Sequence, residues 1–140
     1  MATEEFPGIS AATRQKIGIS VGLVGGGLSG MAVYSNLGDL PAGLVMTVLT
    51  GVGLYFLLPY VVPPRDEETG FLIAASEETD GFHVGAAGVA VTGGGFFFMA
   101  GLFTFDQVVP ALGIACVFAL VEYLVFSRVL PRGHIQNQGY

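Results

Sequence analysis

The chain repeats itself at a fixed offset, and this repeat constrains the fold more than any other feature. Gly25-Gly26-Gly27 recurs as Gly93-Gly94-Gly95, 68 positions later. The same offset superposes further identical pairs, namely Met31 and Met99, Ala32 and Ala100, Leu44 and Leu112, Tyr55 and Tyr123, Val61 and Val129, and Pro63 and Pro131. Each copy, roughly residues 17–63 and 85–131, contains two apolar segments. The sequence therefore predicts a duplicated transmembrane hairpin.

The composition is that of a membrane protein, because 52% of the residues are hydrophobic and only 11% are charged. Some stretches are long enough to cross a hydrocarbon core of about 30 Å. We place these spans at Ile17–Leu37, Pro41–Val62, Phe82–Thr104 and Val108–Leu130. The predicted fold is an all-α membrane protein, in which four transmembrane helices form two tandem, parallel-repeat hairpins and an antiparallel bundle.

The expected organisation along the chain follows from these spans. Residues 1–16 form an N-terminal segment, 17–63 the first hairpin and 82–131 the second hairpin. Residues 64–81 form an acidic loop between the hairpins, and residues 132–140 form a tail. The short connections within each hairpin make its two helices antiparallel neighbours.

The basic residues predict the orientation in the membrane. All of them fall on one side of the predicted spans, and they are Arg14, Lys16, Arg65, Arg128 and Arg132. The opposite side carries Asp39 and Asp106. Because cytoplasmic loops are enriched in Lys and Arg, we expect both termini inside the cell and a multi-pass location in the cytoplasmic membrane.

Most of the acids gather on the same side as the basic residues. They are Glu4, Glu5, Asp66, Glu67, Glu68, Glu77, Glu78 and Asp80. Short acidic runs rich in Ser and Thr, in a chain with a single Lys, resemble the small membrane proteins of salt-loving, haloarchaeal organisms. An acidic inner face argues against binding of nucleic acid. The expected partners are membrane lipids and other integral membrane subunits, or a second copy of the chain.

Small residues recur at every fourth position in several spans. They are Gly18, Gly22, Gly26 and Gly30 in the first span, Gly43, Thr47 and Gly51 in the second, and Ala111, Ala115 and Ala119 in the fourth. Residues four apart share a helix face, and small faces allow the close backbone approach that holds helices together in lipid. Two readings stay open, which are packing inside the bundle and docking against another membrane protein or a second copy.

Glu122 is an acid inside a predicted span, six residues and about 9 Å from Arg128. Its counterpart in the first repeat is Leu54. An intramembrane acid is costly and indicates function by default, so Glu122 is our candidate to relay protons or bind a cation. Candidate partners are Tyr55, Ser20 and His83. The alternative is a neutral or snorkelling Glu that forms hydrogen bonds inside the bundle.

The sequence gives no sign of an enzyme, a cofactor or a metal site. It contains no Ser/His/Asp set, no Cys/His metal spacing and no phosphate-binding loop after a strand. Two hypotheses for function follow. The first is a non-catalytic accessory or scaffold subunit of a larger membrane complex, for example a respiratory one. The alternative is a small transporter or a proton- or cation-coupled channel that uses Glu122.

Overall fold

A computed structural model describes residues 11–61 and 82–130. Its helices are α1 (Ala11–Leu37), α2 (Leu40–Val61), α4 (Val84–Phe105) and α5 (Val108–Val129). Each of these four helices contains a segment long and apolar enough to cross a membrane. The described chain is therefore an all-α, multi-pass membrane protein, as the sequence predicted.

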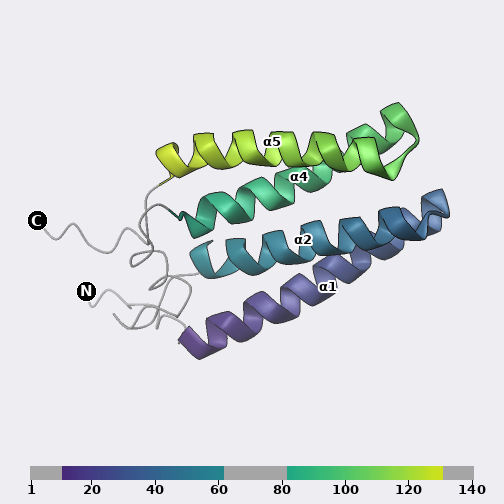
Figure 1. Cartoon of the computed structure of the whole chain (residues 1–140). Coiled ribbons are helices and arrows are strands. Elements are labelled where there is room, and N and C mark those ends of the chain that lie inside the picture. The colour runs from purple at the N-terminus through teal and green to yellow at the C-terminus, as the bar shows by residue number, and fades with distance from the viewer. Residues whose placement is uncertain (1–10, 62–81, 131–140) are drawn as a thin grey trace, which may run out of the picture.

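The helices form an antiparallel bundle of two hairpins (Figure 1). Helix α1 packs on α2, α2 packs on α4, and α4 packs on α5. Both hairpin turns lie at the same end of the bundle (Figure 1). Helix α4 is the most enclosed helix, with 50% of its span buried, whereas 11% of the α5 span is buried. The outer surface of the bundle is therefore provided mainly by the other helices.

A small apolar core joins all four helices near the hairpin turns. It consists of Val33 from α1, Ala42 from α2, Phe98 and Leu102 from α4, and Ala111 and Ala115 from α5. Phe98 is fully buried there, whereas Phe96, two residues earlier, is 77% exposed. Large apolar side chains on the outside are expected in a bilayer, because lipid tails are as apolar as leucine.

The repeat predicted from the sequence is also present in the backbone. Helix α2 and helix α5 begin and end at positions that differ by 68. The hairpin turns contain Gly38 with φ 69° and Asp106 with φ 52°, again 68 residues apart. The Gly38 N–H donates to Tyr34 O and the Asp106 N–H to Leu102 O, both over 2.8 Å. Both hairpins thus close with the same left-handed cap.

The start of the first helix differs from the prediction. Helix α1 begins at Ala11, six residues before the predicted span, so residues 11–16 of the predicted N-terminal segment are helical. We derived the boundary from hydropathy, but a helix can extend past the apolar span through good helix formers such as Arg14 and Lys16. The other helix ends differ from the predicted spans by at most two residues. The predicted acidic loop and tail lie outside the described residues.

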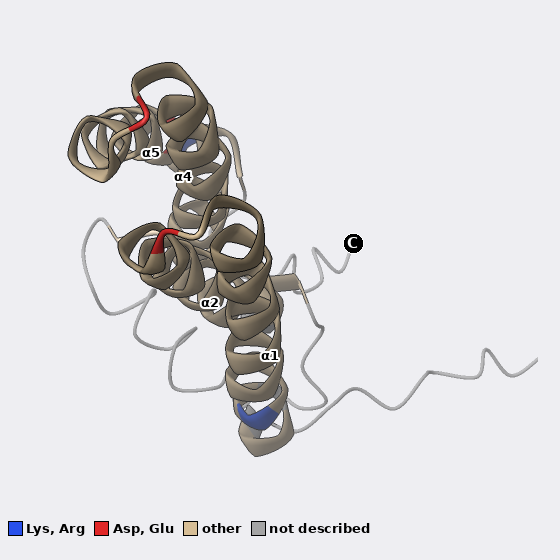
Figure 2. Cartoon of the chain, turned by 90° about the vertical axis from the view of Figure 1, so that its right-hand side faces the viewer, with Lys and Arg blue, Asp and Glu red and all other residues tan. Residues whose placement is uncertain are grey.

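Charged residues mark the two ends of the bundle. Asp39 and Asp106 lie at the hairpin turns, which face the viewer in Figure 2. Arg14 and Lys16 lie in the first turns of α1, and Arg128 lies in the last turn of α5. The charge asymmetry expected from the sequence is therefore present among the described residues.

Candidate functional site

The glycine ladders of α1 and α2 face each other. A Cβ atom added at Gly22 would lie 2.8 Å from Gly51 O, and one added at Gly26 would lie 2.6 Å from Thr47 O. A Cβ added at Gly30 would lie 2.5 Å from Gly43 O. The two backbones are therefore in direct contact, as in other close helix pairs in membranes.

The second hairpin repeats this contact with slightly larger residues. A Cβ added at Gly94 would lie 3.3 Å from the Ala119 Cβ and 3.5 Å from Ala115 O. A Cβ added at Gly101 would lie 2.7 Å from the Ala111 Cα. Gly94 and Ala119 are the counterparts of Gly26 and Gly51 in the first hairpin. The small residues that the sequence singled out thus lie between helices of the same hairpin, and Gly18 is likewise buried.

The interface between the hairpins uses small residues that we did not single out from the sequence. An added Cβ at Gly53 of α2 would lie 2.7 Å from the Thr92 N atom, and one at Gly88 of α4 would lie 2.6 Å from the Leu57 N atom. Gly85 faces the Tyr60 ring and Gly95 faces Met46. A signal was available, because positions 85, 88, 92 and 95 are all small and follow helical spacing.

Glu122 lies against α4 at Gly93. A Cβ added at Gly93 would lie 2.7 Å from the Glu122 Cδ atom. In the first hairpin, Leu54 lies against Gly25 in the same way. Both pairs are related by the offset of 68, so Glu122 occupies the place of an apolar side chain in the duplicated fold.

One oxygen of the Glu122 carboxyl group lies without a hydrogen-bond partner in the described part of the chain. Glu122 Oε2 is buried and accepts or donates no hydrogen bond among the described residues. In the hydrocarbon region no bulk water satisfies such a group, so an unpaired polar atom is costly. The Glu122 carboxyl group is therefore the candidate group of this site for binding a proton.

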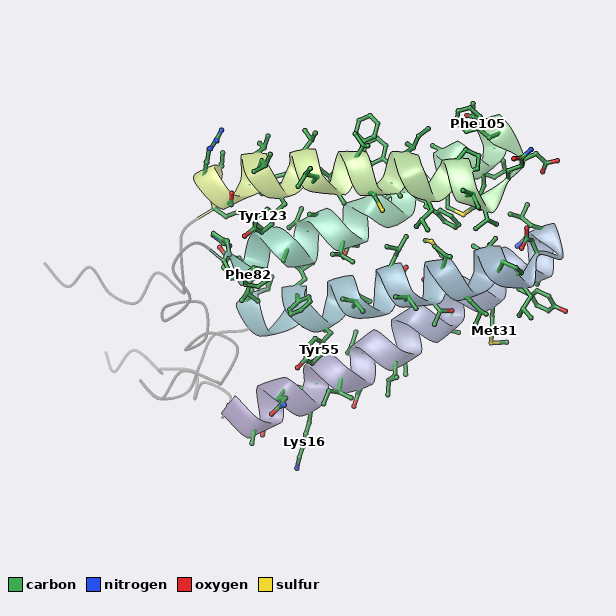
Figure 3. All side chains as sticks on the ribbon, in the orientation of Figure 1. Lys16, Met31, Tyr55, Phe82, Phe105 and Tyr123 are labelled. Atoms are coloured by element: carbon green, nitrogen blue, oxygen red, sulfur yellow. The ribbon has the colours of Figure 1, made fainter. Side chains whose placement is uncertain are left out.

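The candidate partners of Glu122 are not gathered around it. The Tyr55 Cβ packs near Gly22 in the first hairpin, and its ring contacts Phe56 edge-on. Ser20 is exposed on α1. Figure 3 shows Tyr55 between α1 and α2, whereas Tyr123 belongs to α5. The sequence placed these residues at similar depth, but packing within each hairpin keeps Tyr55 and Ser20 away from the α4–α5 contact.

His83 is the residue that caps the N-terminus of α4. Its side chain is 2% exposed, and its Nδ1 accepts the Ala86 N–H over 3.1 Å. Its Nε2 lies 3.1 Å from Leu130 O, which assigns the proton to Nε2. Its backbone N–H donates to the Tyr123 hydroxyl over 3.1 Å. Both ring nitrogens are thus occupied, and His83 caps α4 while it joins α4 to the end of α5.

Aromatic rings surround this cap. The Phe82 ring stacks on the Tyr123 ring with centroids 6.1 Å apart, and it contacts Phe56 edge-on at 6.4 Å. The Tyr60 ring lies 5.7 Å from the His83 ring. This cluster therefore links α2, α4 and α5 at the end of the bundle opposite the hairpin turns.

An apolar groove of about 320 Å³ lies between α1 and α2. Its lining consists of Ile19, Gly22, Leu23, Thr47, Val48, Gly51, Val52 and Tyr55. No group of three or more potential metal-ligating side chains occurs within residues 11–61 and 82–130. Comparison with protein-family models, curated proteins and solved structures finds no match to this chain.

Proposed function

We propose that the chain is a small membrane transport protein, coupled to protons or a monovalent cation, in which Glu122 is the coupling acid. The observation that carries this proposal is the buried Glu122 Oε2 atom, which has no hydrogen-bond partner among the described residues. Acidic side chains inside membrane spans are rare and often belong to proton or ion pathways, which supports a functional role for Glu122.

The repeat supports a functional reason for this acid. Leu54 fills the corresponding place against Gly25, so the hairpin contact itself does not require a carboxyl group. The coupling step is the binding of one proton by the Glu122 carboxylate and its later release, or the exchange of that proton for a cation. Gly93 leaves the space that the carboxyl group occupies.

Flux measurements in vesicles test this function. The protein is reconstituted, and movement of protons and of Na⁺ is followed with pH- and Na⁺-sensitive dyes. We expect Glu122→Gln to abolish flux without changing the amount of folded protein, because an amide cannot take up and release a proton. Asp106→Asn, at the hairpin turn, is the matched control and should retain flux. Unchanged flux in Glu122→Gln would reject the role of Glu122.

A second candidate function is an accessory or scaffold subunit of a larger membrane complex. Such a partner would dock on the outer surface of α5, where Val109 is 82% exposed and Val117 and Leu120 are each 61% exposed. The glycines of α1 and α2 pack on each other inside the first hairpin, so a partner protein would have to contact the bulky outer side chains. Purification from the native membrane in mild detergent should then yield a stoichiometric membrane partner, which Leu120→Arg should release.

We further propose that the hairpin turns face the outside of the cell. The support is the position of Asp39 and Asp106 at one end of the bundle and of Arg14, Lys16 and Arg128 toward the other. Gln107→Cys in a Cys116→Ser background should react with a membrane-impermeant maleimide in intact cells. Reaction only after cell lysis would reverse the proposed orientation.

A further inference from the structure

The contact between the two hairpins is head-to-tail, because α2 of the first packs on α4 of the second. The offset of 68 makes α5 the counterpart of α2, and α1 the counterpart of α4. A closed twofold arrangement of the hairpins would therefore also pack α5 on α1. Among the described helices, the close pairs are α1 with α2, α2 with α4 and α4 with α5. The contact is made once, and within residues 11–61 and 82–130 the surfaces that would make it a second time are not covered by a helix.

The open surface on α1 corresponds to the part of α4 that α2 covers. Gly85, Gly88, Thr92 and Gly95 contact α2. Their counterparts, which we call the α1 docking face, are Ile17, Ser20, Val24 and Gly27. Val24 is 62% exposed, and a Cβ added at Gly27 would meet no atom within 4 Å. This face therefore has no covering helix among the described residues.

The open surface on α5 corresponds to the part of α2 that covers α4. Met46, Leu49, Gly53 and Leu57 make that contact in α2. Their counterparts, which we call the α5 docking face, are Ile114, Val117, Val121 and Val125. Val117 is 61% exposed, and Val121 and Val125 are each 50% exposed. This face is apolar and bulky, and it ends at Arg128, the counterpart of the Tyr60 that faces Gly85. No helix of the described residues covers it.

We propose that the α5 docking face of one copy of this chain packs on the α1 docking face of a second copy. The occupant follows from the molecule itself, because α2 already packs on α4 through the counterparts of these two faces. Heterologous contacts of this kind build a ring when the rotation closes. Two chains joined by two such contacts are the smallest closed assembly.

The α2–α4 contact inside the chain predicts which residues of the two docking faces lie opposite each other. The Leu49 Cβ lies 4.0 Å from a Cβ added at Gly95. Their counterparts, Val117 and Gly27, would meet at the same level between copies. Val121 replaces Gly53, so the backbones must lie further apart there than at the Gly53–Thr92 contact. Ser20 and Ile17 likewise replace Gly88 and Gly85, which lie against Leu57 and Tyr60 inside the chain. The contact between copies thus keeps the same order of residues but is wider at these levels.

Disulfide crosslinking in native membranes tests the proposal. The distance of 4.0 Å between the Leu49 Cβ and a Cβ added at Gly95 falls within the Cβ–Cβ range of a disulfide, about 3.5–4.5 Å. In a Cys116→Ser background, Gly27→Cys with Val117→Cys should give a crosslinked band at twice the chain mass, or at higher multiples for a larger ring. The matched control is Leu49→Cys with Gly95→Cys, which should crosslink within one chain and leave the band at the monomer mass.

The single variants give the direction of the contact. Neither Gly27→Cys nor Val117→Cys alone should crosslink, because each face meets the other face and not itself. A strong dimer band from either single variant would overturn the proposal in favour of a symmetric contact. A monomer band from the double variant, with the control pair crosslinked, would also overturn it.

Native mass spectrometry of the unmodified chain in mild detergent gives an independent measurement. We expect a dimer or a larger closed assembly that Gly27→Leu reduces at least tenfold, because a leucine would project from the α1 docking face. A monomer at all concentrations, or a complex with a different protein on α5, would overturn the proposal. This measurement does not depend on Glu122, so it is independent of the transport function.

Discussion

The Glu122 carboxyl group of α5 lies directly against Gly93 of α4, so that a side chain at position 93 would collide with it. The same place in the first hairpin holds Leu54 against Gly25. The two hairpins can therefore be compared directly, since one has a carboxyl group at this position and the other has an apolar side chain. Replacing Glu122 by leucine, or Leu54 by glutamate, distinguishes the effect of the side chain on packing from its effect on transport.

Glu122→Leu, which restores the residue of the first repeat, should stabilise the bundle. It removes a buried polar atom without a partner among the described residues, a defect that typically costs about 1–3 kcal/mol. The free energy of unfolding is measured by SDS titration in mixed micelles. Leu54→Glu is the reciprocal variant and should destabilise the chain by a similar amount. A loss of stability in Glu122→Leu would show that the carboxyl group has a stabilising partner.

Gly93→Ala should displace the Glu122 carboxyl group, because the added Cβ would overlap with it. The far end of a flexible side chain can move and alanine favours the helix by about 1 kcal/mol over glycine, so the unfolding free energy should change little, while flux should fall. Because Glu122→Gln by itself abolishes flux, the double-mutant cycle is measured on the unfolding free energy, where the effects of the two substitutions should be non-additive. Additive effects would show that the two positions act independently.

Gly26→Ala should destabilise the first hairpin, because its Cβ would lie 2.6 Å from Thr47 O and 3.0 Å from the Gly51 Cα. These are backbone atoms, and separating two helices costs typically about 1–3 kcal/mol. Gly113→Ala on α5 is the matched control, because its Cβ would meet no atom within 4 Å. The control should be neutral or stabilising by up to about 1 kcal/mol through helix propensity. Equal effects of the two substitutions would contradict the close α1–α2 contact.

Asp106→Gly should stabilise the second hairpin turn by up to about 1 kcal/mol. Asp106 has φ 52°, and a left-handed conformation costs most residues other than glycine roughly this amount. The first hairpin already has Gly38 at the corresponding position. Gly38→Ala is the opposite change and should be destabilising. Thermal unfolding midpoints in detergent compare the two variants, and a lower midpoint for Asp106→Gly would show that its side chain supports the turn.

His83→Ala should loosen the start of α4 by about 1 kcal/mol, because it removes the acceptor for the Ala86 N–H. His83→Asn keeps an acceptor at the cap position and should recover part of that loss. Hydrogen exchange of the α4 N-terminal amides measures the effect. Slow exchange in both variants would show that the remaining contacts hold this end without the imidazole, namely the Phe82–Tyr123 stacking and the backbone hydrogen bond from residue 83 to Tyr123.

The sequence by itself determined the membrane class, the four spans and the repeat. Apolar runs of sufficient length need no tertiary information, because a bilayer core of about 30 Å selects them directly. The repeat at an offset of 68 even determined details of the backbone, since Gly38 and Asp106 share a left-handed conformation. The start of α1 at Ala11 was not determined, because hydropathy marks the span and not the end of helical hydrogen bonding.

Tertiary structure decided which faces meet. The spacing of Gly22, Gly26 and Gly30 fitted both internal packing and docking, and only the contact with Gly43, Thr47 and Gly51 distinguishes them. It also decided that Glu122 lies against Gly93, away from Tyr55 and Ser20. In the described part of the chain, α2 covers α4, whereas no helix covers the corresponding faces of α5 and α1. The physical reason is that lipid solvates every apolar face equally well, so hydropathy cannot say which faces pack on each other.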